Sequence, residues 1–265
     1  MDTWDPAQYA KFKREREQPF ADLLALIEPA PAMRIVDLGC GTGNLTRRLH
    51  EALGARETIG IDTSARMLEA ATRDPLPPGL RFQTGAVEDF AGRESFDLIF
   101  SNAVFHWIED HEALIGRLAS ALKAGGQLAF QIPAMHDTPS HSLPDELTET
   151  PRFRAAFGGW RRPQPVLEPA DYARILFRAG FREPKVRLII YPHVLASRDE
   201  VFEWTKGTLL TEYEKRLPPD VSKDFVEAFR QGLRSRLADE RPFLFPFKRI
   251  LCWGRRSASR RTPRT

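Results

Sequence analysis

The chain has 265 residues and a mass of 30.2 kDa, which suffices for one large α/β domain or for a core domain with a smaller appended element. Hydrophobic residues make up 42% of the chain and charged residues 28%, and the mean hydropathy is −0.39, a composition that excludes an intrinsically disordered protein. No apolar run approaches the ~18 residues of a membrane-spanning helix, and the first residues lack the basic and apolar regions of a signal peptide. We therefore expect a cytoplasmic protein that does not contact a membrane.

The positive charge gathers at the C-terminal end. The formal net charge is +3, but residues 255–265 hold five arginines and no acid, so the preceding residues carry −2. We expect residues 255–265 to form a disordered basic tail. A nucleic-acid enzyme carries its basic footprint on the folded surface, so this distribution predicts that nucleic acid is not a partner. With only Cys40 and Cys252, the sequence predicts neither a disulfide framework nor a metal site built from several cysteines.

The first half of the chain alternates between short apolar runs and helical spacing. After Pro19, the apolar residues Phe20, Leu23, Leu24 and Ile27 have the spacing of one helical face and predict a first helix. Short apolar runs predict strands over 33–38, 58–62, 80–82, 96–101 and 127–132. Helical spacing between these runs predicts helices over 45–53, from 64 and after 110. Five strands that alternate with helices indicate a parallel, doubly wound sheet.

Beyond Pro133 this alternation breaks. Residues 134–168 read as loop-rich, and apolar spacing then predicts a helix over 172–179, a strand over 186–191, helices between 192 and 242, and a last strand over 247–253. We therefore expect an α/β fold with a doubly wound, mostly parallel seven-stranded sheet and a helical lid insertion. The expected single domain spans 1–254, with a core at 20–133, 170–192 and 243–254 and a lid from 1–19, 134–169 and 193–242.

A glycine-rich turn joins the first strand to the next helix. Asp37 precedes three alternating glycines, Gly39, Gly41 and Gly43. Such a turn lets backbone N–H groups at a helix N-terminus approach a ligand that a Cβ atom would exclude. A dinucleotide fingerprint has Gly or Ala at its sixth position, where this chain has Asn44, so the pattern departs from that of a dehydrogenase. A strained turn that binds no ligand is the alternative interpretation.

An acid closes the second strand of the predicted sheet. Asp62 lies at the carboxyl end of that strand, beside the glycine turn, where its carboxylate can accept hydrogen bonds from a vicinal diol. Alternatively it caps the helix that follows, a role that Ser64 can take instead. We predict the ligand-binding role for Asp62.

These residues resemble the class I methyltransferases that use S-adenosylmethionine, whose first motif is an acid followed by Gly-x-Gly-x-Gly. The resemblance implies that Asp62 takes the ribose hydroxyls and that the main-chain N–H of Val87 reads the adenine ring. The family usually has an adenine-contacting Asp where this chain has Ala86. The cofactor-binding residues implied by the resemblance are Asp37, Gly39, Gly41, Gly43, Asp62, Val87 and Asn102.

More closely, residues from about 4 to 254 resemble the trans-aconitate methyltransferase family. The segment 101–107 lacks the prolines that follow the fourth strand in nucleobase amino-methyltransferases, which favours a small-molecule substrate. The residues that carry the resemblance lie in the first segment, after the fourth and fifth strands and in the insertion: Trp4, Tyr9, Phe12, Glu15, Arg16, Pro19, Asn102, Ala103, Trp107, Asp110, His111, Gln131, Pro133, Tyr191, His193, Trp204, Gly207, Thr208 and Leu210. In this chain, Thr211 replaces an arginine common in the family, and Ala134 and Met135 replace Asp-Asn.

Methyl transfer to a carboxylate needs alignment and exclusion of water, because the sulfonium is already a strong electrophile. A hydroxyl or carbon acceptor needs a base, and the predicted catalytic residue is His106, which follows the fourth strand and could also hydrogen-bond the substrate. Packing against Trp107 is its alternative role. The predicted substrate-binding residues are Trp4, Tyr9, Arg16, Trp107, Tyr191, His193 and Trp204. Packing is the alternative for the aromatic residues, and solvent exposure for Arg14, Arg16 and Lys206.

The sequence thus predicts an S-adenosylmethionine-dependent methyltransferase, a monomer or homodimer, that methylates a carboxylate oxygen of a small organic acid resembling trans-aconitate. A natural-product O-, N- or C-methyltransferase is the alternative on the same fold. A nicotinamide oxidoreductase and a cofactor-binding protein without catalysis are the alternatives from other classes.

Overall fold

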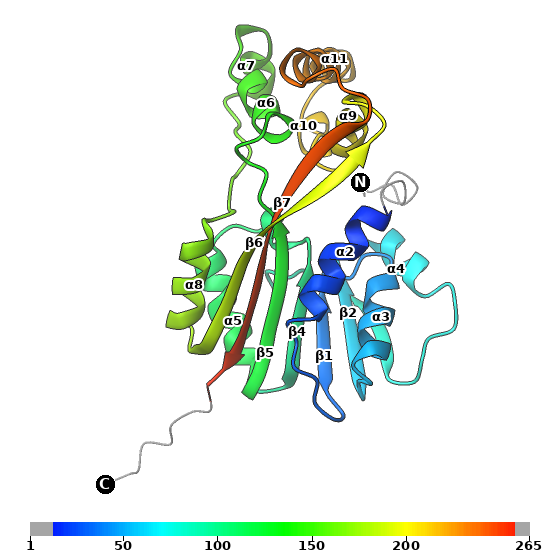
Figure 1. Ribbon diagram of the computed structural model, residues 1–265, viewed down its shortest axis with the longest axis vertical. Coiled ribbons are helices and arrows are strands. Elements are labelled where there is room, and N and C mark those ends of the chain that lie inside the picture. The colour runs from blue at the N-terminus through cyan, green and yellow to red at the C-terminus, as the bar shows by residue number, and fades with distance from the viewer. Residues whose placement is uncertain (1–12, 258–265) are drawn as a thin grey trace. The chain divides into compact units, whose positions relative to one another are not determined.

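A computed structural model describes residues 13–257, and for residues 13–16 it describes the backbone only. Seven strands form one sheet in the order β3-β2-β1-β4-β5-β7-β6 (Figure 1). The strands are β1 (Arg34–Leu38), β2 (Glu57–Asp62), β3 (Leu80–Thr84), β4 (Phe96–Asn102), β5 (Leu122–Pro133), β6 (Phe181–Leu195) and β7 (Phe243–Arg256). The helices are α2 (Lys13–Leu24), α3 (Asn44–Ala52), α4 (Ala65–Ala71), the 3₁₀ turn η1 (Phe105–Trp107), α5 (His111–Ala121), α6 (Pro139–Thr148), α7 (Pro151–Phe157), α8 (Pro169–Arg178), α9 (Asp199–Lys206), α10 (Thr211–Glu214) and α11 (Pro219–Arg236).

The chain divides into two compact units. The sheet unit comprises Arg16–Pro133, Pro165–Ile189 and residues 249–257. Among the residues whose side chains are described, the helical unit comprises Ala134–Gln164 and Ile190–Lys248. The strands β6 and β7 belong partly to each unit.

The first five strands of the sheet are parallel. β1 pairs with β2 and with β4, so that Asp37 lies opposite Gly60 on one side and Phe100 on the other. β2 pairs in parallel with β3, and β4 with β5, whereas β7 runs antiparallel to β5. The short apolar run of β1 is buried along almost its whole length, as a central parallel strand requires. The predicted mostly parallel, seven-stranded sheet is confirmed.

Helices cover both faces of this sheet (Figure 1). On one face, Phe20 of α2 and Leu49 of α3 pack in one buried cluster with Phe100 of β4. Residues alternate between the faces of a strand, and on the other face Phe130 of β5 contacts Tyr172 of α8, with 5.7 Å between the ring centroids. The carboxyl ends of the parallel strands remain for a ligand, as in other doubly wound sheets.

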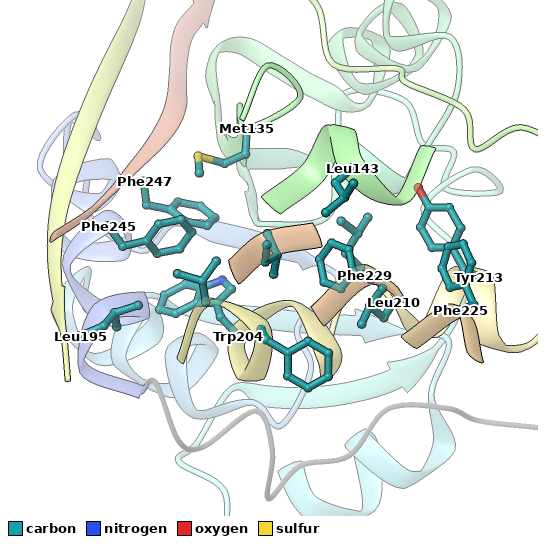
Figure 2. Packing of buried hydrophobic residues seen from close by; sticks show 14 of the residues in the cluster. Met135, Leu143, Leu195, Trp204, Leu210, Tyr213, Phe225, Phe229, Phe245 and Phe247 are labelled. Atoms are coloured by element: carbon teal, nitrogen blue, oxygen red, sulfur yellow. The ribbon is translucent and has the colours of Figure 1, made fainter. Parts of the chain in front are cut away.

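The helical unit has its own core, which is rich in aromatic rings (Figure 2). Phe225 of α11 lies 5.2 Å from Phe153 of α7 and 5.5 Å from Tyr213 of α10, measured between ring centroids. The Tyr213 hydroxyl donates a hydrogen bond to Asp145, and the Arg162 guanidinium binds both groups at 2.9 Å. The buried Tyr213 hydroxyl at the edge of this core is thereby satisfied by charge-assisted bonds.

Two parts of the sequence prediction were wrong. The segment 134–168, expected to be loop-rich, holds α6 and α7, and each helix begins with a proline directly after a threonine, Thr138 or Thr150. Proline at the first helical position is favourable because its missing N–H would have no partner there. β7 extends to Arg256, so the first two residues of the expected tail are in a strand. Residues 258–265 lie outside the described part of the chain.

Candidate functional site

The glycine turn between β1 and α3 has three residues in the left-handed region. The φ angles are 75° at Gly39, 54° at Gly41 and 72° at Gly43. The main-chain N–H groups of Gly39 and Cys40 both donate to the Ile61 carbonyl, at 2.7 and 3.0 Å. The turn is therefore bound to the end of β2, and glycine is required at positions where a Cβ atom would be strained.

The three glycines are needed for different reasons. A Cβ atom on Gly39 would overlap the methyl groups of Val104, and one on Gly43 would lie 2.5 Å from the Phe82 ring. A Cβ atom on Gly41 would meet nothing within 4 Å. Packing within the protein thus accounts for Gly39 and Gly43, whereas Gly41 borders open space that a ligand can occupy.

Asp62 has a structural role in addition to its predicted one. Its carboxylate accepts from the main-chain N–H of Gly41 at 2.8 Å and from that of Ser64 at 2.9 Å. The cap of α4 is Ser64, whose hydroxyl accepts from the Met67 N–H at 3.1 Å. Two backbone bonds therefore fix the half-buried Asp62 carboxylate beside the turn, with lone pairs left for a diol.

Asp37 is buried beneath the same turn. One carboxylate oxygen, Oδ2, accepts from the Thr46 hydroxyl of α3 at 2.6 Å, and the other, Oδ1, has no hydrogen-bond partner among the described residues. Burial raises the pKa of Asp37 to about 7, the Thr46 hydrogen bond opposes this shift, and the charge of Asp62 adds to it. Burial and the same two carboxylates also raise the pKa of the Cys40 thiol, which is therefore not a thiolate.

These groups fit S-adenosylmethionine. The cofactor brings positive charge, a ribose diol and an adenine ring, and the turn offers the unpartnered Oδ1 of Asp37, the fixed carboxylate of Asp62 and the open space at Gly41. A buried carboxylate without a partner is costly unless a cation or donor reaches it. Val87, the predicted adenine contact, lies in the loop after β3 with its side chain buried.

The loop after β4 lies directly against this turn. Val104 packs on Gly39, and the preceding Ala103 has a φ of 61°, with its N–H donating to the Gln131 carbonyl at 2.9 Å. His106 and Trp107 follow in η1, both half-buried, with 4.6 Å between their ring centroids. The sheet unit thus brings the predicted acceptor residues His106 and Trp107 next to the predicted cofactor turn.

A buried pair that the sequence interpretation missed supports this loop. His111 contacts the Phe105 carbonyl through Nε2 at 2.7 Å and the Tyr172 hydroxyl through Nδ1 at 2.6 Å. A carbonyl can only accept, so Nε2 carries the proton and Nδ1 accepts from the tyrosine. Burial lowers the pKa of His111, which keeps the ring neutral. The only signal in the sequence was the resemblance at His111, because Tyr172 is 61 residues away.

A second missed group joins β4, β5 and β7. The Gln131 amide donates to Asn102 Oδ1 at 2.8 Å and accepts from Arg249 Nη1 at 3.0 Å. Gln131 and Arg249 are 1% and 4% exposed, which is unusual for these residue types. Asn102, predicted to bind the cofactor, is therefore held by a polar network.

The remaining predicted substrate residues are distributed differently. Tyr191, His193 and Trp204 come together in the helical unit, where the His193 ring stacks at 5.2 Å on Trp204 and at 6.3 Å on Tyr191. All three side chains are buried, so they pack in the core, and their contact with substrate stays a prediction. Trp4 and Tyr9 lie outside the described residues, and so does the Arg16 side chain.

The positions that depart from the family pattern have ordinary structural roles here. Thr211 begins α10, and its hydroxyl donates to the Thr208 carbonyl at 2.6 Å. Ala134 and Met135 are buried, and the Met135 sulfur accepts from the Lys248 N–H at 3.1 Å. These side chains contribute packing where the family more often has polar groups.

Within residues 13–257, no three His, Cys, Asp or Glu side chains gather in a way that could hold a metal ion. None of the described helices has the length and apolar character needed to cross a membrane.

Solved structures resemble this chain over most of its length. The YcgJ protein from Bacillus subtilis matches with a TM-score of 0.61 and 18% identity, covering 92% of this chain and all of that one. Phosphoethanolamine N-methyltransferase 2 of Haemonchus contortus, solved with S-adenosyl-L-methionine, matches with a TM-score of 0.55 and 18% identity, covering 91% of this chain and 52% of that one. At this identity the likeness shows the fold.

Sequence relatives show the family. The family model described as "Methyltransferase domain" matches residues 35–126. The trans-aconitate 2-methyltransferase of Deinococcus radiodurans is 40% identical over 256 residues, which cover 94% of this chain and 96% of that relative. The family resemblance and the cofactor predicted from the glycine turn are therefore confirmed: the chain belongs to the trans-aconitate 2-methyltransferase family of S-adenosylmethionine-dependent methyltransferases.

Proposed function

We propose that this methyltransferase acts on a carboxylate oxygen of a small organic acid resembling trans-aconitate. The observation that carries the proposal is the 40% identity to a trans-aconitate 2-methyltransferase across almost the whole of both chains. The site geometry supports it, because the loop with His106 and Trp107 lies against the glycine turn through the contact of Val104 with Gly39. An acceptor held at this loop is adjacent to the cofactor turn.

For methyl transfer to a carboxylate, the protein has to bind the two reactants and align them. S-adenosylmethionine supplies a methyl group on a positively charged sulfur. The acceptor's carboxylate oxygen forms the new bond to the methyl carbon, the carbon–sulfur bond breaks, and its electron pair stays on sulfur. A carboxylate is ionised at pH 7, so no proton moves in this step. The charges of Asp37 and Asp62 favour binding of the cationic cofactor.

His106 is then a hydrogen-bond donor to the acceptor rather than a general base. Its place in η1, directly after the carboxyl end of β4, supports contact with the acceptor. Because a carboxylate needs no base, His106→Ala should lower kcat by less than tenfold. A phenol or carbon acceptor that relies on a base would lose about 10²–10⁴-fold.

A natural-product methyltransferase is the second candidate. It is favoured by the buried Ala134 and Met135 and by Thr211, which replace polar family residues and suit a less highly charged acceptor. On this reading the fold and the cofactor are the same, and only the acceptor differs.

A screen with a methyl-labelled cofactor separates the two candidates. The purified enzyme is incubated with di- and tricarboxylates, phenols and amines, and labelled products are identified by mass spectrometry before and after mild base treatment. A carboxyl methyl ester loses its label in base, whereas a methyl ether or methylamine keeps it. Base-labile products from carboxylates are expected, and base-stable products confined to phenols or amines would overturn the proposal.

A further inference from the structure

Three polar side chains form a hydrogen-bonded chain across neighbouring strands of the sheet unit. Asn102 at the end of β4 lies opposite Gln131 of β5, and Gln131 lies opposite Leu251 of β7. Side chains that are opposite each other, or two residues apart on the same strand, share one face of the sheet. Asn102, Gln131 and Arg249 are therefore on the same face, which accounts for the bonds of 2.8 and 3.0 Å that link them.

Arg249 sets the direction of every bond in this chain. A guanidinium has donors and no acceptor, so the Gln131 atom that it contacts must be the amide oxygen. The other end of the Gln131 amide is then NH₂, which donates, so the Asn102 atom that it contacts must also be the oxygen. Asn102 is left with its NH₂ group, from which no residue in the described range accepts a hydrogen bond.

The NH₂ group of Asn102 lies close to the glycine turn and to the loop that holds His106. Asp37 of β1 pairs with Phe100 of the parallel strand β4. Asn102, two residues after Phe100, therefore lies at the level of Gly39, two residues after Asp37. The next residues bring Val104 onto Gly39 and lead to His106. A pair of N–H donors at this edge suits an acceptor molecule with an anionic oxygen. An amine nucleophile would instead need a hydrogen-bond acceptor there to receive its N–H.

We propose that Asn102 binds the carboxylate of the methyl acceptor through its amide hydrogens, and that Gln131 and Arg249 are positioning residues that fix the direction of that amide. The proposal rests on the proposed function and adds the group that selects carboxylates over amines. The buried guanidinium polarises the two amides in sequence and strengthens the outer N–H donors. Because the amide is held before the substrate arrives, less conformational entropy is lost on binding. On this proposal Asn102 binds the methyl acceptor rather than the cofactor.

The first test replaces the donors without changing the shape. In Asn102→Asp the NH₂ group becomes an oxygen, so the KM for the carboxylate acceptor should rise about tenfold to hundredfold. Titration with S-adenosylhomocysteine, the demethylated product, should give a dissociation constant within about threefold of wild type. An unchanged KM, or a loss confined to cofactor affinity, would overturn the proposal.

The second test reverses the amide while keeping the Asn102 side chain. In Gln131→Glu both oxygens of residue 131 accept, one of them from Arg249, so Asn102 must turn its NH₂ towards residue 131 and present its own oxygen. The KM for the carboxylate should rise at least tenfold. A second measurement uses, as an inhibitor, an analogue in which a carboxamide replaces that carboxylate. The affinity of the analogue divided by the affinity of the acid should be at least tenfold higher in Gln131→Glu than in wild type.

If Gln131 had only a structural role, Gln131→Glu would bind the acid and the carboxamide analogue more weakly by the same factor. An equal loss, or an unchanged preference for the acid over the analogue, would contradict the proposal. Gln83→Glu is the matched control, since it makes the same charge change on an exposed side chain that accepts from Arg81 at 2.7 Å. Thermal unfolding checks that each variant is folded, and if Asn102→Asp fails to fold, Gln131→Glu decides. Failure of the proposed function is distinct, because wild type would then form no base-labile methyl ester with any carboxylate.

Discussion

Two buried polar groups, one in the sheet unit and one in the helical unit, differ in how their hydrogen bonds are satisfied. In the sheet unit, Asp37 is 3% exposed, its Oδ1 has no partner among the described residues, and the Asn102 amide keeps its NH₂ group available. In the helical unit, the buried hydroxyl of Tyr213 is bonded to both Asp145 and Arg162. Unsatisfied buried polar groups are costly, and they persist where a ligand completes them. We therefore expect the Asp37 group of the sheet unit to bind a ligand and the Tyr213 group of the helical unit to support packing.

The largest expected effect concerns packing in the helical unit. Phe225 is fully buried between the Phe153, Phe157 and Tyr213 rings, so Phe225→Ala should destabilise this unit by about 3–5 kcal/mol. Affinity for S-adenosylhomocysteine should stay within about threefold at temperatures where the variant is folded. Urea unfolding and calorimetric titration give the two values. Phe177→Ala, at a side chain 74% exposed, is the matched control and should change stability by less than about 0.5 kcal/mol. A large loss of cofactor affinity in Phe225→Ala would show that the two units do not have separate roles.

The second effect separates packing from binding within the glycine turn. Gly39→Ala forces a Cβ atom into Val104 at a positive φ, and should cost about 2–4 kcal/mol of stability. Gly41→Ala has open space for its Cβ atom, so it should cost only about 1 kcal/mol, from its φ of 54°. Cofactor affinity should nevertheless fall at least tenfold in Gly41→Ala, because the methyl group enters the space assigned to the ligand. Equal stability losses in the two variants, with affinity intact in Gly41→Ala, would refute this division.

Asp62→Ala tests the binding role of a residue that also holds the turn. Loss of a charge-assisted hydrogen bond to the ribose should cost ~1.5–3 kcal/mol, which weakens cofactor affinity by tenfold or more. Asp62→Asn keeps an oxygen that can accept from Gly41 and should recover part of the loss. Titration of both variants measures the effect. Wild-type affinity in Asp62→Ala would show that the carboxylate only supports the backbone.

The smallest effect is the pH dependence from Asp37. The pKa of Asp37 is about 7 in the folded protein and near the ordinary aspartate value of 3.8 in the unfolded chain, so the folded state binds the proton more tightly. The resulting stability is fully present below pH 3.8 and is lost as the pH rises towards 7. Wild type should lose on the order of 2 kcal/mol relative to Asp37→Asn between pH 5 and 7, measured by urea unfolding.

Cofactor affinity should change with pH in the opposite direction. A cationic ligand favours the ionised carboxylate, so wild-type affinity should rise between pH 6 and 8, and the affinity of Asp37→Asn should not. Parallel pH profiles for the two proteins would remove Asp37 from the site.

The early strands and the cofactor turn could be predicted because their signals are local. β1, β2 and β4 are short apolar runs that end at a glycine or a polar residue, and the structure places their ends within one or two residues of the prediction. Asp37 and Asp62 are recognisable for the same reason, since each lies at or next to the carboxyl end of its strand. By contrast, β6 and β7 are longer than expected, because their outer faces mix charged, proline and apolar residues.

The supporting networks could not be predicted from local signals. Gln131 and Arg249 are 118 residues apart, and only the antiparallel pairing of β5 with β7 brings them together. His111 and Tyr172 are likewise joined by the packing of α5 near α8. α6 and α7 were missed because the regular alternation of the first half ends at Pro133, and the proline that begins each helix was not used as a signal.

Hydrogen exchange followed by mass spectrometry, with and without S-adenosylhomocysteine, tests most directly that the sheet unit binds the cofactor. We expect slower exchange on binding in peptides that cover the glycine turn at 38–46, the end of β2 at 61–65 and the loop at 84–88. The same peptides should be unprotected in Gly41→Ala at equal ligand concentration. Protection confined to peptides of the helical unit, with these three segments unchanged, would contradict it.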